Sequence, residues 1–364
     1  MKYRINKYLS NLDLLFYITL FLFFFNKFVN QISFLNIYKN EWAFSESLID
    51  YSAGFVRRGL LGELFSWVSL NSGIALINIS FIFFTLSLAH LLFFIFTKSK
   101  NYSFLMRLVL MFSPFGLYYL FSNLNFFFGR RDLLILNFLI LFNSKIIKEN
   151  FKIQILVFII FGTILTLTYE MFLFFLPIFW KLILKKAKEH SYIKNISFSY
   201  LTILNILMLT KYSISNNYVL LCKNIEEKRI QMKLDNLGCW GAPEYLNHED
   251  KSLWINEVLQ GLSFRSNYLL WLILLLLLIT FINNYSFLEF SNKLSVSTLF
   301  ILFFFAQDYG RWMFLIFFTT LILRVEKKYI ESSKFKVISY ILIFSGLIID
   351  VPIYLFQDKP FFKF

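Results

Sequence analysis

Residues 73–97 read GIALINISFIFFTLSLAHLLFFIFT, and this apolar run decides the fold class. A helix needs ~20 apolar residues to cross the ~30 Å hydrocarbon core of a bilayer, so the run is long enough to span a membrane. Residues 14–35, and residues 268–282 with their flanks, have the same character. None of these runs alternates as a strand would. Helices also satisfy their own backbone hydrogen bonds in lipid, so the sequence predicts an all-α, polytopic transmembrane helix bundle.

The overall composition is that of a membrane protein. Of the 364 residues, 58% are hydrophobic, 21% are aromatic and 16% are charged, and Phe alone occurs 50 times. A soluble core of this size does not require so much apolar material. The net charge of +14 comes from short Lys and Arg clusters between apolar runs. This distribution favours a topological role at the bilayer and argues against nucleic acid as a partner.

The basic clusters predict the topology. By the positive-inside rule they are cytoplasmic, and two cytoplasmic flanks require an even number of crossings between them. The bundle then has about 10–12 helices and a cytoplasmic N-terminus, and residues 1–364 form one membrane domain. Residues 36–72 become the first outer loop, residues 213–264 the one large outer loop, and the tail from Gln357 lies outside. The clusters are Lys2/Arg4/Lys7, Lys98/Lys100/Arg107, Lys145/Lys148/Lys152, Lys181/Lys185/Lys186/Lys188/Lys194 and Arg324/Lys327/Lys328/Lys334/Lys336.

Two predicted hairpins have polar turns near their middle. Residues 152–181 contain Tyr169-Glu170, and residues 293–324 contain the turn 307–311. At 1.5 Å per residue each leg is ~22 Å long, which is short of the ~30 Å core. The turns are therefore expected to end inside the outer leaflet. Alternatively, lysine side chains snorkel to the head groups, so that each leg includes a few more residues within the membrane and the turns reach the surface.

Ionisable residues from four separate segments gather at the predicted outer end of the bundle. Each costs ~2.5–3.5 kcal/mol at membrane depth, so such groups tend to line a wet cavity or to pair with one another. A functional site is the default hypothesis for a set of this kind. The set comprises Asp50, Arg57, Arg58, Glu63, Arg130, Arg131, Asp132, Glu170, Asp308 and Arg311.

The first outer loop is expected to contain an amphipathic helix that begins at about Phe55. Its apolar stripe faces away from a small and polar face, which suits close approach of a ligand or another helix. The alternative is an interfacial helix with snorkelling arginines. The stripe is Leu60, Leu61, Leu64, Phe65 and Val68, and the opposite face is Arg58, Gly59, Gly62, Glu63 and Ser66.

The other charged positions each allow a purely structural interpretation. Arg130, Arg131 and Asp132 open a helix, where they either anchor its end or leave surplus positive charge. Asp308 and Arg311 are spaced i, i+3 and can form a simple intrahelical pair. Glu170 has no basic neighbour in its own hairpin, so it pairs with a distant arginine, stays protonated or serves as a base.

Arginine grips phosphate oxygens in bidentate fashion without a metal. The arginines of this set therefore fit an anionic head group such as a lipid pyrophosphate. The three histidines, His90, His190 and His248, are scattered, so we expect no metal site. The sequence also lacks a P-loop and a dinucleotide fingerprint, so we expect no nucleotide cofactor.

The two cysteines, Cys222 and Cys239, both fall in the predicted large outer loop. In an oxidising periplasm a bridge between them would stabilise the loop by ~3 kcal/mol. Two reduced thiols are the alternative, and the sequence leaves the choice open.

Four motifs and the large late loop together carry a family resemblance. The motifs are DYSAGFVRRGLLG at 50–62, GRRD at 129–132, YE at 169–170 and DYGR at 308–311. The chain thereby resembles the O-antigen polymerase (Wzy-type) group of polytopic, GT-C-like glycosyltransferases. The resemblance implies metal-independent chemistry at the periplasmic face of a bacterial inner membrane, where undecaprenyl-pyrophosphate-linked oligosaccharide units are joined and undecaprenyl pyrophosphate is released.

The resemblance also implies roles for individual residues. Residues that would hold and neutralise the pyrophosphate are Arg57, Arg58, Arg130, Arg131 and Arg311, with Asp132 beside them. One of Asp50, Glu170 and Asp308 would orient or deprotonate the acceptor hydroxyl, with Glu170 favoured for its isolation. A chain-length regulator protein is a possible partner. The alternatives are a flippase or transporter of the same lipid-linked unit, and another polyprenyl-linked glycosyltransferase.

Overall fold

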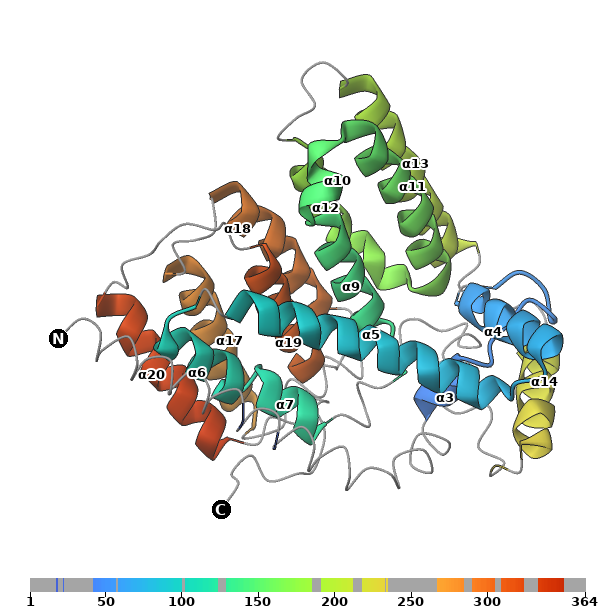
Figure 1. Cartoon of the computed structure of the whole chain (residues 1–364), viewed down its shortest axis with the longest axis horizontal. Coiled ribbons are helices and arrows are strands. Elements are labelled where there is room, and N and C mark those ends of the chain that lie inside the picture. Colours follow the sequence, from blue (N-terminus) through green and yellow to red (C-terminus); the bar gives the residue numbers. More distant parts are fainter. Residues whose placement is uncertain are drawn as a thin grey trace.

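The computed structural model of the chain is a helical assembly (Figure 1). Every regular element among the described residues is a helix, which confirms the predicted all-α class. The structure describes residues 18, 22, 42–56, 58–99, 102–123, 129–184, 191–211, 218–232, 234, 267–284, 290–304, 309–323 and 333–349.

The described helices have the following bounds. Their order is α3 (Trp42–Glu46), α4 (Gly59–Ser72), α5 (Leu76–Ser99), α6 (Phe104–Phe112), α7 (Leu117–Ser122), α9 (Asp132–Phe142), α10 (Lys145–Glu149), α11 (Phe151–Thr168), the 3-10 helix η1 (Glu170–Phe175), α12 (Leu176–Leu184), α13 (Ser191–Thr210), α14 (Tyr218–Gln231), α17 (Asn267–Asn284), α18 (Phe290–Ser297), the 3-10 helix η2 (Thr298–Phe304), α19 (Tyr309–Ile322) and α20 (Ser333–Ile348).

Within the described ranges, four helical segments are long and apolar enough to cross a membrane. They are α5, the segment Phe104–Ser122 that contains α6 and α7, α11 and α13. Shorter apolar helices, such as Asp132–Phe142 and Gly310–Ile322, lie among them. The chain is therefore a polytopic membrane protein. The predicted first span, 14–35, lies outside the described residues except for Ile18 and Leu22, and the tail from Gln357 lies outside them altogether.

The predicted break at Tyr169-Glu170 is confirmed. Helix α11 ends at Thr168, Tyr169 is extended, and the chain continues as η1 and then α12. Of the second predicted turn, 307–311, residues 309–311 instead form the start of α19, and residues 307–308 lie outside the described part of the chain. The apolar run at 196–210 also predicts a helix, which is confirmed within α13, and the predicted helix 268–282 is confirmed within α17.

Two predicted helix starts and one predicted loop differ from the structure. The helix expected from about Phe55 begins only at Gly59, because Gly54 (φ 104°) and Arg58 (φ 68°) have left-handed backbone conformations that interrupt a helix. The apolar run at 337–356 predicts a last helix from Val337, and that helix begins at Ser333. The large loop at 213–264 contains the regular helix α14.

The predicted small face of α4 packs closely against the preceding segment. A Cβ atom added at Gly62 would overlap the carbonyl oxygen of Ile49 and would lie 2.9 Å from that of Ser47. A Cβ at Gly59 would meet the ring of Tyr51. The predicted apolar stripe is split, since Leu61 and Phe65 are buried whereas Leu64 is exposed. The close approach expected of this face is therefore made by residues 47–51.

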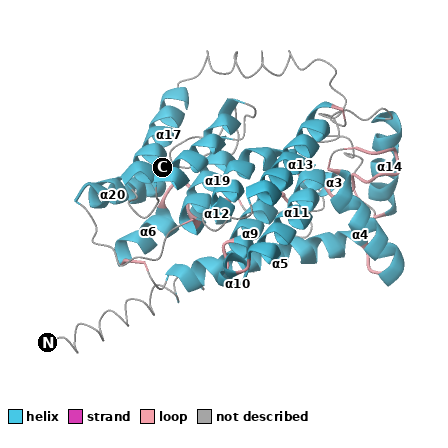
Figure 2. Cartoon of the chain, turned by 90° about the horizontal axis from the view of Figure 1, so that it is seen from above, coloured by secondary structure: helices cyan, strands magenta, loops and turns pink. Residues whose placement is uncertain are grey.

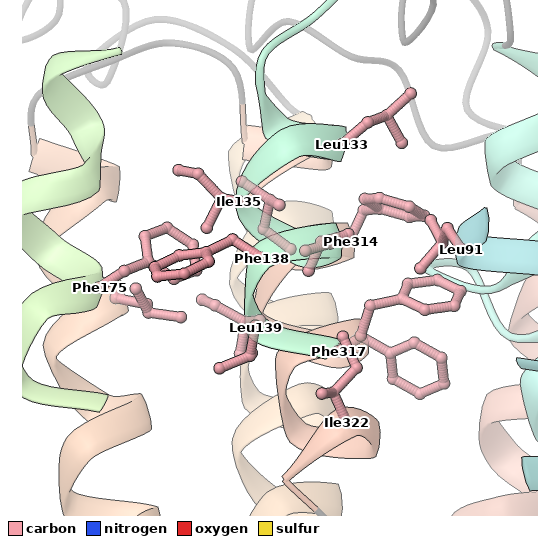
Figure 3. Close-up of a cluster of buried hydrophobic side chains, with 14 of the residues drawn as sticks. Leu91, Leu133, Ile135, Phe138, Leu139, Phe175, Phe314, Phe317 and Ile322 are labelled. Carbon is pink, nitrogen blue, oxygen red and sulfur yellow. The ribbon is translucent and has the colours of Figure 1, made fainter. Parts of the chain in front are cut away.

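Helix α9 lies at the centre of the core (Figure 3). Its side chains pack against α5, α11 and α19, and Phe138 stacks on Phe179 of α12 with ring centroids 4.6 Å apart. Leu133, Ile135 and Leu139 are fully buried. Eight of the eleven residues of α9 are buried, so neighbouring helices cover most of its surface. The core thus fixes the position of the charged N-terminus of α9.

Candidate functional site

The first feature of the site is a buried carboxylate shared by two arginines. One oxygen of Glu46 accepts a hydrogen bond from Arg58 Nη1 at 3.0 Å, and the other oxygen pairs with Arg131 Nη1. Arg131 Nη2 also donates to the backbone carbonyl oxygen of Glu46 at 2.8 Å. The side chains of Glu46 and Arg131 are 5% and 1% exposed, whereas that of Arg58 is 16% exposed. These contacts join segments that lie 85 residues apart in the sequence.

Helix ends position these three side chains. Glu46 is the last residue of α3, and Arg131 is the N-cap of the buried helix α9. Arg58 is the N-cap of α4 and, among the described residues, the one non-glycine residue with positive φ. Such a conformation costs about 1–3 kcal/mol for an ordinary residue. The contact with Glu46 is one of the interactions that hold Arg58 in it.

The second feature is a triad of Asp132, Tyr169 and Arg311. The Tyr169 hydroxyl donates to Asp132 Oδ1 at 2.7 Å, and Arg311 Nε lies 3.3 Å from Asp132 Oδ2. Arg311 Nη2 donates to the Tyr169 hydroxyl oxygen at 3.4 Å. The break that ends α11 at Thr168 places Tyr169 here, and Arg311 comes from the first turn of α19. All three side chains are buried.

The electrostatics connect the two features. Burial alone would raise the pKa of Glu46, but the charges of Arg131, Arg58, Arg130 and Arg311 oppose it, and the pKa lies below its ordinary value of 4.5. Four arginines from α4, α9 and α19 thus act on one carboxylate. A second buried carboxylate beside these arginines, that of Asp132, pairs with Arg311.

A neighbouring ion pair joins the first loop to α14. Lys228 pairs with Asp50 Oδ2, and Arg229 Nη1 donates to Ser45 Oγ at 3.1 Å. Burial would raise the pKa of Asp50, but hydrogen bonds from Lys228 and Ser52 bring it below its ordinary value of 3.8. Figures 1 and 2 both place α3, α4 and α14 at the same end of the molecule.

Cys222 of α14 is disulfide-bonded. The sequence holds two cysteines, and the other one, Cys239, lies outside the described residues. The bridged state that the sequence left open is therefore the one that the structure contains.

The structure brings together five of the predicted site residues, namely Arg58, Arg130, Arg131, Asp132 and Arg311. Asp50 instead pairs with Lys228 of α14. Glu63 is exposed and accepts a hydrogen bond from the backbone N–H of Tyr51 at 3.2 Å. Arg57, Asp308 and the side chain of Glu170 lie outside the described residues. The expected Asp308–Arg311 pair is therefore a prediction still, while Arg311 contacts Asp132.

Sequence reasoning missed Glu46, Lys228 and Arg229. Glu46 lies only four residues before Asp50 in the same loop, so its position there was a usable signal. Lys228 and Arg229 belong to a stretch of mixed charge, NIEEKRIQMK at 224–233, in which no single residue stands out. Only the folded arrangement shows that these two cations reach the first loop.

This arrangement is suited to binding an anion. Guanidinium groups are planar donors that match carboxylate and phosphate oxygens, and burial strengthens their electrostatic attraction. In the part of the chain that the structure describes, no three His, Cys, Asp or Glu side chains are grouped as metal ligands would be. The chemistry that these residues offer is therefore charge neutralisation by arginine.

Comparison with known proteins identifies the family to which the chain belongs. A family model described as "Uncharacterised membrane protein Rv1490" matches residues 15–234, which is more than half of the chain. The matched range runs through the first loop, α9 and α11 and ends just after α14. No curated protein and no solved structure matches the chain.

Proposed function

The chain belongs to the Rv1490 family of membrane proteins, and from this premise we propose that it is a glycosyltransferase that uses a polyprenyl-pyrophosphate-linked sugar. Within that class we propose an O-antigen-type polymerase, which joins undecaprenyl-pyrophosphate-linked oligosaccharide units at the periplasmic face of the inner membrane. Four motifs of the sequence, at 50–62, 129–132, 169–170 and 308–311, support this choice by their resemblance to such enzymes.

The observation that carries the proposal is the convergence of four arginines on the Glu46 carboxylate. Arg58, Arg130, Arg131 and Arg311 all lower the pKa of this one carboxylate. Pyrophosphate is a multiply charged anion whose oxygens match the arginine fork. A lipid-linked pyrophosphate would bring its charge to a membrane protein without having to leave the bilayer. The cluster thus offers the donor groups that a leaving pyrophosphate requires.

In the proposed reaction, the hydroxyl oxygen of the acceptor sugar attacks the anomeric carbon of the donor. The bond from that carbon to the phosphate oxygen breaks, and its electron pair leaves with the polyprenyl pyrophosphate. The arginines stabilise the charge that develops there. A carboxylate takes the proton of the attacking hydroxyl.

The three predicted bases differ in what supports them. Asp50 is paired with Lys228, and its lowered pKa makes it a weak base. Glu170 begins η1 directly after Tyr169, whose hydroxyl contacts both Asp132 and Arg311. We therefore retain Glu170 as the preferred base and Asp308 as the alternative.

Deletion of the gene and complementation test this function. Arg58→Gln should leave the protein in the membrane but yield lipopolysaccharide with one repeat unit only, because the variant loses a charge at the pyrophosphate. Lys152→Gln, at an exposed position of α11, should restore the full ladder of chain lengths.

A full ladder from the Arg58→Gln variant would contradict the assigned role. Loss of the single-repeat product as well would instead identify a flippase, because the unit would then not reach the periplasm. A product changed by one branching sugar would indicate another polyprenyl-linked glycosyltransferase.

A further inference from the structure

We propose that the Glu46 carboxylate is the resident counter-anion of the arginine cluster and that the substrate's pyrophosphate displaces it from Arg58 and Arg131. The inference rests on the proposed function and deepens it. It assigns a role to Glu46 in the binding step: an internal competitor for the position that the pyrophosphate takes.

The contacts of Glu46 are those of an anion occupying a phosphate site. Each carboxylate oxygen engages a different arginine, Arg58 on one side and Arg131 on the other. These arginines come from the N-caps of two separate helices, α4 and α9. A phosphoryl group presents oxygens to two guanidinium groups in the same way. The carboxylate thus stands where one phosphate would bind.

The backbone anchor of Glu46 allows its side chain to leave without unfolding the segment. Arg131 Nη2 donates to the carbonyl oxygen of Glu46 at 2.8 Å, independently of the carboxylate contact. The adjacent Ser45 accepts a hydrogen bond from Arg229. The end of α3 is therefore held through groups other than the exchanging carboxylate, and rotation of one side chain removes the carboxylate from both guanidinium groups.

The chemistry of pyrophosphate favours the exchange. Glu46 makes its two arginine contacts with a single negative charge, and Asp132 is engaged with Arg311 and the Tyr169 hydroxyl. Pyrophosphate brings more charge and more acceptor oxygens than the carboxylate that it replaces. Asp132 differs from Glu46, because it is held by a neutral hydroxyl as well as by an arginine, and it serves as a positioning group that stays in place.

A purely structural salt bridge predicts the opposite behaviour on mutation. If Glu46 only held the two arginines in place, its removal would disorder them and weaken anion binding. If Glu46 competes with the substrate, its removal frees the site and strengthens anion binding, because the binding of two competitors for one position is coupled. The sign of the change therefore distinguishes the two roles.

The test is calorimetric titration of inorganic pyrophosphate into the purified full chain in lipid nanodiscs. Glu46→Gln should bind about 10-fold more tightly than the wild type. Glu227→Gln is the matched control, since Glu227 is exposed on α14 and forms an ion pair with Lys223 one turn away. Its affinity should equal that of the wild type.

A second variant and a second probe complete the design. Glu46→Asp keeps the negative charge, but its shorter side chain cannot reach both arginines. This variant should therefore also bind pyrophosphate more tightly than the wild type. It replaces Glu46→Gln in the test if Glu46→Gln fails to fold. Undecaprenyl pyrophosphate, incorporated in the same nanodiscs, should show the same gain. A gain confined to inorganic pyrophosphate would assign the site to a free anion and overturn the exchange with a lipid-linked substrate.

Two further outcomes separate the inference from the function on which it rests. Unchanged or weaker binding by folded Glu46 variants, with measurable binding by the wild type, would overturn the exchange and leave the pyrophosphate site standing. Absence of binding in the wild type and in every folded variant would overturn both.

Discussion

Arg131 is the residue whose geometry the site depends on most closely. One guanidinium group contacts both the carboxylate and the backbone carbonyl of Glu46. Arg131→Lys keeps the charge but cannot make both contacts, so it should cost about 1.5–3 kcal/mol of stability. Transfer activity per folded molecule should fall at least about 10-fold. Thermal unfolding in detergent and a product assay measure the two effects.

Arg107→Lys is the control for that change. Arg107 is also buried, but its Nε donates to the carbonyl oxygen of Ser99 in a different part of the molecule. It should lose stability without losing activity per folded molecule. Equal losses of activity in both variants would show that Arg131 matters only for folding.

The pH dependence of stability follows from two carboxylates at this end of the molecule. Glu46 and Asp50 have folded-state pKa values below their ordinary values of 4.5 and 3.8. Their contribution is therefore fully present above those ordinary values and is lost as the pH falls through the folded-state values. The unfolding temperature should hold level down to about pH 5 and fall progressively below it. Glu46→Gln should flatten this fall, and an unchanged profile in that variant would contradict the assignment.

At the level of residues, the sequence predicted which arginines converge but not the carboxylate that they surround. Charge at membrane depth is costly, so Arg58, Arg131 and Arg311 stood out by their position alone. Glu46 did not, because a single acid in a polar loop is ordinary in a sequence. Its pairing with residues 12 and 85 positions away depends on tertiary packing, which periodicity and composition do not encode.

At the scale of elements, the contact of α4 with residues 47–51 sets the distance between Glu46 and Arg58. Gly62→Ala would force a methyl group onto the carbonyl oxygen of Ile49, and a backbone atom cannot move aside as a flexible side chain can. The variant should lose about 1–3 kcal/mol of stability and much of its pyrophosphate binding. Asn71→Ala, on the exposed end of α4, should lose neither. Normal binding by Gly62→Ala would show that α4 does not position Arg58.

The apolar runs of the sequence predicted that these segments are helices and roughly where they lie. They did not predict where some helices begin, and they did not predict the polar helix α14. The apolar pattern of α4 continues back to Phe55, but left-handed backbone at Gly54 and Arg58 delays the helix to Gly59. Hydrophobic periodicity carries no information about such backbone conformations. The polar helix α14 has no strong apolar stripe and is ordered by its contacts with the first loop.

At the scale of the whole molecule, α14 links the late loop to the first loop across 178 residues of sequence. Lys228→Met leaves Asp50 buried without its cation, so the unfolding temperature should fall, with a loss of about 3–5 kcal/mol. Asp50→Asn combined with Lys228→Met should recover part of that loss. Lys223→Met is the matched control, because Lys223 is exposed and should have almost no effect.

The failure of the double variant to recover stability would show that Lys228 acts without Asp50. Reduction of the Cys222 disulfide should lower the unfolding temperature of the wild type for a related reason, since the bridge restrains the same loop. Together these measurements decide whether the late loop is part of the site's framework.

The central claim is that the arginine cluster holds a lipid-linked pyrophosphate while sugars are joined. The most direct measurement uses the purified chain in nanodiscs with synthetic undecaprenyl-pyrophosphate-linked oligosaccharide, and follows chain length on a gel. The account predicts a ladder of products with the wild type and only unreacted units with Arg58→Gln. The absence of a ladder with folded wild-type protein, or an identical ladder with the variant, would contradict it.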